Sequence, residues 1–267
     1  MENDPADPDK AHAEAIAEAK RRMRLARTGA LATLDAPGGA PLATLIGVAS
    51  DFDGAPLFLM STLSRHTRNL AHDPRASLLL TGRHERGDPL NHPRVTLNGR
   101  VERCPAPRAK ARYLQRNPKA GLYAGFADFA VFKLRVEDVH FNGGFGRAAP
   151  LTPAEVLISR EGEAALTHAE ERLLTEANGL GPAALARLAG HKTARPLWRA
   201  IGLDAEGLDL AAGGRPARAQ FAAPAHEAEA WRTRLEALLA VTGASEMSDK
   251  PRMMAPMARP VGQSGKR

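Results

Sequence analysis

Cysteine and aromatic residues are both scarce in this sequence. Cys104 is the single cysteine among 267 residues, so neither an internal disulfide nor a cysteine-based metal cluster can form. Its neighbours, Arg103 and Pro105, offer no base that would activate a thiol, which favours a structural role. Aromatic residues make up only 4% of the chain, too few for the base-stacking platform of a protein that binds single-stranded nucleic acid.

Long hydrophobic runs are absent as well. No stretch approaches the roughly 20 apolar residues that a membrane-spanning helix needs. Residues 1–7 are acidic and no apolar run follows them, which argues against a secretory signal. We therefore expect a cytoplasmic protein with no membrane partner.

The charge of the chain is strongly positive but evenly distributed. The formal net charge is +7, and a basic surface attracts the phosphates of nucleic acids. Arginines, however, lie beside acidic residues along the whole length, as in the pairs Glu14 and Arg21 or Glu229 and Arg232. An overall bias toward arginine explains this pattern better than a binding stripe, so we expect no nucleic-acid partner.

Several catalytic patterns are also missing. The sequence contains no Ser-His-Asp or Cys-His arrangement, no Walker loop and no dinucleotide-binding glycine fingerprint, which excludes the common hydrolase and nucleotide-triphosphatase mechanisms. His84 and His92 lie near Glu85 and Asp88, but their spacing matches no metal-ligand pattern, and we predict no metal site.

Apolar residues make up 43% of the chain, enough for the core of one large or two modest domains. Their period is first helical, with Ala15, Ala19 and Met23 on one stripe of a helix predicted for 9–27. It then becomes extended, and hairpin turns at 35–40 and 51–54 indicate an antiparallel sheet. Six strands are predicted at 29–34, 41–49, 56–60, 76–81, 94–102 and 129–139, with helices at 65–72 and 105–116.

A second domain is predicted after the glycine-rich segment 142–147. Its pattern gives helices at 161–177, 182–188 and 224–241 and strands at 199–203 and 215–221. Residues 244–267 are rich in serine, glycine, proline and basic residues and have no apolar period, so we predict a disordered tail. The predicted organisation is an α+β protein with a sheet domain at 10–150 and a smaller α/β domain at 151–243.

The most informative segment lies between the predicted strands 56–60 and 76–81. Residues 61–70 place hydroxyl groups and free backbone N–H groups at the mouth of a short helix, with Arg65, His66 and Arg68 beside them. Such donors form a receptor for a phosphate monoester. Pro74 ends the helix and so keeps its N-terminus beside the preceding strand. A capped surface helix with solvated arginines is the alternative that this segment alone leaves open.

The same segment carries a resemblance to a known family. Ser64-Arg65-His66-Thr67-Arg68-Asn69-Leu70, followed by residues 73–79, resembles the phosphate-binding strand-helix-strand of the pyridoxamine 5'-phosphate oxidase-like FMN-binding split barrels. Four further segments are similar to the haem-utilisation branch of that superfamily, which carries a C-terminal companion domain. These segments are 87–97, 144–148, 201–210 and 218–221.

The resemblance implies a homodimer of six-stranded antiparallel split β-barrels, with two cofactor sites at the dimer interface that are each built from both chains. It implies FMN or haem as cofactor, and so a flavin-dependent oxidoreductase or a haem-utilisation protein with a flavin or porphyrin ligand. No residue is assigned a catalytic role. The pattern and the resemblance together give these candidate cofactor-binding residues: Thr44, Ser61, Thr62, Ser64, Arg65, His66, Asn69, Ser77, His140 and Arg147.

Some positions depart from the family pattern. His66 lies where the oxidases have a lysine and Thr44 where they have an arginine, so vitamin B6 chemistry is not implied. Residues 177–181, Ala-Asn-Gly-Leu-Gly, replace the Met-Asn-x-Asp-His signature with which the companion domain usually opens. These losses favour the alternative, a non-catalytic flavin- or haem-binding carrier or regulatory protein.

His140 and Arg147 are candidates because of their positions. His140 ends the last predicted strand, and Arg147 follows a flexible glycine-rich segment from which it can reach a phosphate or a propionate. Haem-binding members of the family take their iron ligand from a C-terminal segment, but residues 243–267 contain no histidine. We therefore expect a haem ligand to come from the barrel, with His140 as the first candidate.

Overall fold

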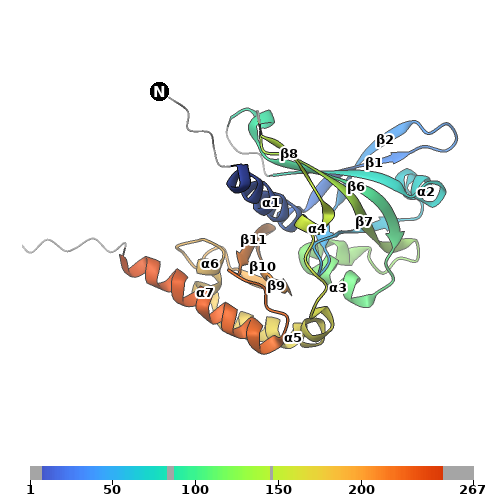
Figure 1. Cartoon of the computed structure of the whole chain (residues 1–267). Helices are drawn as coiled ribbons and strands as arrows, with labels where there is room; N and C mark the ends of the chain where they lie inside the picture. The colour runs from blue at the N-terminus through green and yellow to red at the C-terminus, as the bar shows by residue number, and fades with distance from the viewer. Residues whose placement is uncertain (1–7, 83–86, 145–146, 249–267) are drawn as a thin grey trace, which may run out of the picture.

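The computed structural model describes residues 8–82, 87–144 and 147–248, with side chains through residue 243. A curled antiparallel sheet forms the larger unit, and a three-stranded sheet with the helices α5, α6 and α7 forms the smaller one (Figure 1). The α+β class agrees with the prediction. No helix in the described ranges is long and apolar enough to cross a membrane.

The first helix, α1 (Pro8–Leu25), packs across the inner face of the large sheet. Its buried side chains include Ala15, Ala19 and Met23, which confirms the predicted stripe. Alanines on this stripe let the helix backbone approach the sheet closely, and α1 thereby also comes into contact with the second unit.

The large sheet has the strand order β2-β1-β5-β6-β7-β4-β3, and β8 pairs with β7. All six predicted strands are present. The predicted strand 41–49 is divided because the Val48 N–H donates to the Arg27 carbonyl instead of to a neighbouring strand. The strands are β1 (Thr28–Leu34), β2 (Pro41–Gly47), β3 (Ala49–Ser50), β4 (Pro56–Ser61), β5 (Arg75–Thr81), β6 (Arg94–Arg103), β7 (Phe129–Asn142) and the unpredicted β8 (Ala148–Leu151).

The two faces of the large sheet differ. The inner face carries fully buried side chains such as Leu31, Leu78 and Leu97, and α1 packs on it. The outer face of β2, β1, β5 and β6 carries small or uncharged side chains in its middle and arginines such as Arg75 and Arg94 toward its ends, and Leu45 at its edge is 77% exposed. An exposed sheet face of this composition suits an interface with another protein surface.

Short helices connect the strands. Between β4 and β5 lies α2 (Arg65–His72), with the bounds that the sequence predicted. After β6 comes α3 (Pro107–Arg116), which begins two residues later than predicted and uses Pro107 as its first helical residue. Two single turns complete this unit, η1 (Pro89–Asn91) and η2 (Pro118–Leu122).

The second unit packs helices against the sheet β11-β10-β9. Trp231 and Leu235 face its core, as predicted. The last helix continues to Ser248, so residues 244–248 of the predicted disordered tail are helical, and residues 249–267 lie outside the described ranges. The short helix α4 (Pro153–Val156) precedes this unit and packs on α1 and β7. The elements of the second unit are α5 (Glu163–Gly179), α6 (Pro182–Leu188), β9 (Arg199–Asp204), the unpredicted β10 (Gly207–Ala212), β11 (Arg215–Gln220) and α7 (Ala228–Ser248).

A buried ionic network joins the two units. Asp204 at the end of β9 accepts two hydrogen bonds of 2.7 Å from Arg218 and lies 3.1 Å from Nη2 of Arg24 on α1. Arg24 also donates to the backbone carbonyl of Asp51 at 2.8 Å. Burial raises the pKa of the Asp204 carboxyl, but Arg218 and Arg24 outweigh it and hold that pKa at about 2. The carboxylate is therefore ionised at neutral pH.

Two arginines of α3 extend this network. Arg112 donates to Glu170 on α5 at 2.5 Å and to the Leu203 carbonyl at 3.0 Å. Arg116 lies 3.3 Å from the Asp209 carboxylate on β10. Because these contacts connect α1, α3 and the second sheet, they fix how the two units are oriented.

Candidate functional site

The N-terminus of α2 opens directly beside the end of β4. Ser64 is the N-cap residue, with extended backbone angles, and its hydroxyl donates to the Ser61 carbonyl at 2.8 Å. The first intrahelical donor is the Arg68 N–H, which bonds the Ser64 carbonyl. The N–H groups of residues 65–67 therefore point out of the helix end, where a helix attracts anions.

Arg65 is tied to a carboxylate that the sequence analysis did not single out. Its Nε donates to Oδ1 of Asp35 at 3.0 Å, and its Nη2 contacts the other carboxylate oxygen. Asn69 donates to the same carboxylate at 2.7 Å and to the Thr33 hydroxyl at 3.1 Å. The hydrogen bonds from Asn69 and then from Arg65 lower the pKa of Asp35, so this clamp is ionised at neutral pH.

His66 turns toward the second strand. Its Nδ1 lies 3.3 Å from the Thr44 hydroxyl, which places these two predicted residues in contact. Burial lowers the pKa of His66 from its ordinary value. The ring is therefore neutral at pH 7 and can offer a phosphate one N–H but no full charge.

A second carboxylate borders the helix mouth. Ser61 donates its hydroxyl to Asp128 at 2.5 Å, and the Thr62 N–H donates to the Asp128 carbonyl at 2.7 Å. These bonds hold the loop before β7 against the start of α2. The loop carries the exposed Phe126 and a pair of rings, Tyr123 and Phe129, whose centroids lie 4.9 Å apart.

The helix mouth thus combines hydrogen-bond donors with an apolar rim. Leu63 is 71% exposed at the tip of the turn, close to the aromatic loop. The cation of Arg65 is paired with the Asp35 carboxylate, and the Asp128 carboxylate accepts from Ser61. Attraction for an anion therefore comes from the helix N-terminus and from Arg68, whose guanidinium has no ionic partner within the described residues.

Three predicted residues lie elsewhere in the same chain. Ser77 pairs with Ala32 on the outer face of the sheet, whereas α2 packs on the inner face. His140 is exposed on that same outer face, opposite Thr96. Arg147 follows the far end of the 14-residue strand β7, whose first residue pairs with Ser61, and α2 and β8 lie at opposite ends of the sheet (Figure 1).

Arg147 has a defined local setting at that far end. Its N–H donates to the Gly144 carbonyl at 3.1 Å and its own carbonyl accepts from the Gly143 N–H at 2.8 Å. Gly144 has a φ of +110°, and a Cβ there would lie 2.6 Å from the Asn91 carbonyl, so only glycine fits. These two hydrogen bonds fix the Arg147 backbone beside the end of β7. About 40 Å of strand separates it from α2.

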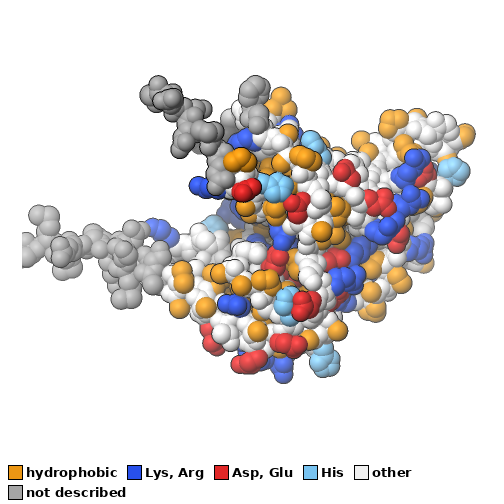
Figure 2. Space-filling view, viewed as in Figure 1, with side chains coloured by type: hydrophobic (Ala, Val, Ile, Leu, Met, Phe, Trp, Pro, Cys, Tyr) orange, Lys and Arg blue, Asp and Glu red, His pale blue; other side chains and the backbone are white. Residues whose placement is uncertain are grey.

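The surface charge and the donor groups limit what else the protein binds. On the face shown in Figure 2, acidic side chains lie beside most of the basic ones. Within the part of the chain that the structure describes, no group of three histidine, cysteine, aspartate or glutamate side chains is arranged to hold a metal ion.

Comparisons with known proteins show which chains this one is similar to. Residues 15–143 match the pyridoxamine 5'-phosphate oxidase family. A curated relative, the chloroplastic non-canonical haem oxygenase HOZ of Arabidopsis thaliana, is 30% identical over 113 residues, or 41% of this chain. The chain spans about a third (34%) of that relative's length.

Two solved structures are similar over most of the chain. A protein of unknown function from Agrobacterium tumefaciens is 34% identical, with a TM-score of 0.74 over 89% of this chain and 98% of that one. A haem-binding protein from Mycobacterium smegmatis is 29% identical, with a TM-score of 0.51 over 86% of this chain and 98% of that one. Both matches extend beyond the barrel into the second unit. The chain therefore belongs to the pyridoxamine 5'-phosphate oxidase-like split-barrel family, on the branch that adds a C-terminal companion domain.

Proposed function

We propose that this protein binds FMN at the N-terminus of α2 and works as a flavin-dependent oxidoreductase. The observation that carries the proposal is the set of donors at the helix mouth: the outward N–H groups of residues 65–67, the hydroxyl of Thr62, and the guanidinium of Arg68. Their chemistry fits a phosphate monoester. The exposed apolar rim of Leu63 and Phe126 fits a flat ring system beside it.

Bound FMN supplies one- and two-electron redox chemistry, while the protein supplies binding and orientation. The residues of α2 hold the phosphate. Asp35 sets how strongly they do so, because it occupies the Arg65 guanidinium and places a negative charge near an anionic ligand. Neutral His66, the second residue of α2, and Thr44 on β2 offer hydrogen bonds without charge.

The site is shared between two chains in a homodimer. Ser77 and His140 lie on the outer face of the sheet, opposite to the face that α2 of the same chain contacts, and Arg147 follows the far end of β7. A second copy packed on the accessible outer face, around Leu45, brings them to the partner's α2. An isologous interface of this kind produces two equivalent sites.

Flavin titrations test the proposal through Asp35. We expect FMN to bind at least about tenfold more tightly than riboflavin, because only FMN offers a phosphate to the charged donors. Asp35→Asn should tighten FMN binding roughly tenfold, since it frees Arg65 and removes a like charge, and should leave riboflavin unchanged. Quenching of flavin fluorescence measures both affinities.

Asp73→Asn is the matched control for this experiment. Asp73 caps the other end of α2 and pairs with Arg75 as Asp35 pairs with Arg65, but it lies away from the helix mouth. This variant should bind both flavins like the unaltered protein. Equal affinity for FMN and riboflavin would contradict phosphate recognition at this site. Weaker FMN binding by the Asp35→Asn variant would show that Asp35 supports phosphate binding instead of competing with the phosphate for Arg65.

A second candidate function is haem binding, which the names of the mycobacterial and plant relatives favour. His140 is exposed, and its ring has no hydrogen-bond partner within the described residues. An exposed imidazole of this kind can ligate iron. The carrier or regulatory alternative differs in one respect: the bound flavin or haem would not turn over with any electron donor.

Haemin titration followed by the Soret band tests this candidate. His140→Ala should weaken haemin binding about tenfold or more, whereas removal of residues 249–267 should leave it unchanged because that segment contains no histidine. His168→Ala, another exposed histidine on α5, is the control. Loss of binding on truncation with retention in the His140 variant would instead point to a methionine of the tail.

A further inference from the structure

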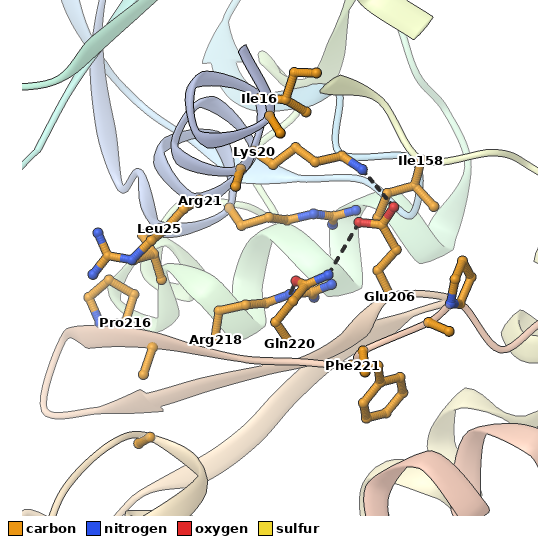
Figure 3. Close-up of a pocket in the computed structure, with 18 of the residues that line it drawn as sticks. Ile16, Lys20, Arg21, Leu25, Ile158, Glu206, Pro216, Arg218, Gln220 and Phe221 are labelled. Carbon is orange, nitrogen blue, oxygen red and sulfur yellow. Dashed lines mark hydrogen bonds and ion pairs between the residues drawn. The ribbon is translucent and has the colours of Figure 1, made fainter. Parts of the chain in front are cut away.

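A cleft of about 650 Å³ lies between α1 and β11, where the two units of the protein meet (Figure 3). Its walls come from both units, and its volume falls within the range of small-molecule sites. It is separate from the mouth of α2, and none of the candidate residues for the cofactor site lines it.

Most of the cleft wall is apolar. Ile16 and Leu25 of α1 face Pro216 and Phe221 on and just after β11, and Ile158 closes one side. Alanines fill much of the remaining wall, so the side chains leave an open space along the helix. Such a surface suits the apolar body of a ligand.

The polar part of the lining is mainly basic. Lys20 spans the cleft to Glu206 at 2.6 Å, and Gln220 lies 3.5 Å from the other oxygen of the same carboxylate (Figure 3). Glu206 is the one acidic residue among the described lining residues, against four basic ones. Two of those four, Arg24 and Arg218, are committed to the buried Asp204.

Arg21 is the basic lining residue without a close ionic partner. Its nearest carboxylate, Glu18, lies 3.7 Å away and already accepts a 2.5 Å hydrogen bond from Arg22. The Arg21 side chain is 56% exposed, so its guanidinium is free to receive an anionic group at the rim of an apolar cleft.

We propose that this cleft binds a carboxylate with an apolar body, the carboxylate on Arg21 and the body along Ile16, Leu25 and Phe221. The ligand touches α1 and β11 together and so links the companion domain to the barrel. An alkyl carboxylate and a porphyrin share this chemistry. The inference does not depend on the function proposed for the mouth of α2.

Titration calorimetry on the full chain tests the proposal with decanoate, its neutral counterpart decanamide, and metal-free protoporphyrin IX. Arg21→Gln should weaken the bound carboxylate about tenfold, as expected for one charge-assisted hydrogen bond. Arg172→Gln is the matched control, because Arg172 is equally exposed on α5 and lies 3.9 Å from Glu176. It should change nothing.

Ala17→Phe completes the test. Ala17 is exposed and lines the cleft, so a phenyl ring there fills the cleft without entering the core, and circular dichroism checks the fold. Binding of decanoate or protoporphyrin IX that is lost in this variant supports the site and identifies the source of the carboxylate. The proposal is overturned if neither ligand binds the unaltered protein, if binding survives in the Ala17 variant, or if decanamide binds as tightly as decanoate. FMN affinity, measured in parallel, tests the α2 site separately.

Discussion

Asp204→Asn is expected to destabilise the folded protein by about 3–5 kcal/mol, the range for removing one partner of a buried ion pair. Asp204 is fully buried and is the common acceptor of Arg218 and Arg24. An asparagine keeps the size of the side chain but leaves both guanidinium groups without their main counter-charge. For a chain of this size, the loss corresponds to a melting temperature lowered by roughly 6–20 °C, measurable by circular dichroism.

Glu176→Gln is the control for this prediction. Glu176 accepts two hydrogen bonds from Arg232, as Asp204 does from Arg218, but this pair lies at the surface. Its loss should barely move the melting temperature, because exposed ion pairs contribute little. Similar shifts in both variants would contradict a central role for the buried network.

The pH dependence of stability gives a second readout of Asp204. Its pKa is lowered from 3.8 to about 2 in the folded protein, so the ionised carboxylate contributes its full stabilisation above about pH 4. That contribution is lost as the pH falls from about 4 toward 2. The difference in urea midpoint between the unaltered protein and the Asp204 variant should therefore narrow over this interval.

Local sequence signals predicted the large sheet and α2 closely. Ser64 and Pro74 delimit α2 because a cap and a proline act within a few residues, and the structure has the same bounds, 65–72. β8 was not predicted, because Pro150 within a four-residue segment reads as a loop. Its strand character comes from pairing with β7, which no local pattern encodes.

The burial of the arginines is the main feature that the sequence did not indicate. Arg24, Arg112 and Arg116 read as part of an evenly charged surface, yet all three are buried. Their carboxylate partners lie far away in sequence; Arg24, for example, meets an aspartate 180 residues later. The positions of charged residues along a sequence do not show which of them are buried, because burial depends on how the two units pack.

The candidate site was predicted only in part, because contacts between residues far apart in sequence leave no local signal. Thr44 and His66 are in contact, and Ser61, Ser64 and Arg65 surround one helix mouth. The two carboxylates that border the mouth were missed. Asp35 read only as a turn residue and Asp128 as part of a loop, and each reaches the site across a gap of at least 30 residues.

Mixing two deficient variants is expected to restore FMN sites if each site is built from both chains. Arg65→Ala/Arg68→Ala removes both cations of α2, and Arg147→Ala removes the cation at the far end of β7. Each variant alone should lose FMN binding at a concentration that fills the unaltered protein, because each lesion is present in both sites of its homodimer. In a two-fold dimer containing one chain of each kind, one site carries both lesions and the other carries neither.

When the two variants are mixed in equal amounts and their chains reassort at random, about one quarter of the FMN sites should therefore be restored. The measurement is FMN bound after co-refolding, with sedimentation to show that the species exceeds the 28.5 kDa of one chain. Recovery of FMN binding in the mixture cannot come from either chain alone, since about 40 Å of β7 lies between the two lesions. A dimer without recovery would place the whole site within one chain, and unimpaired binding by the Arg147 variant would remove that residue from the site.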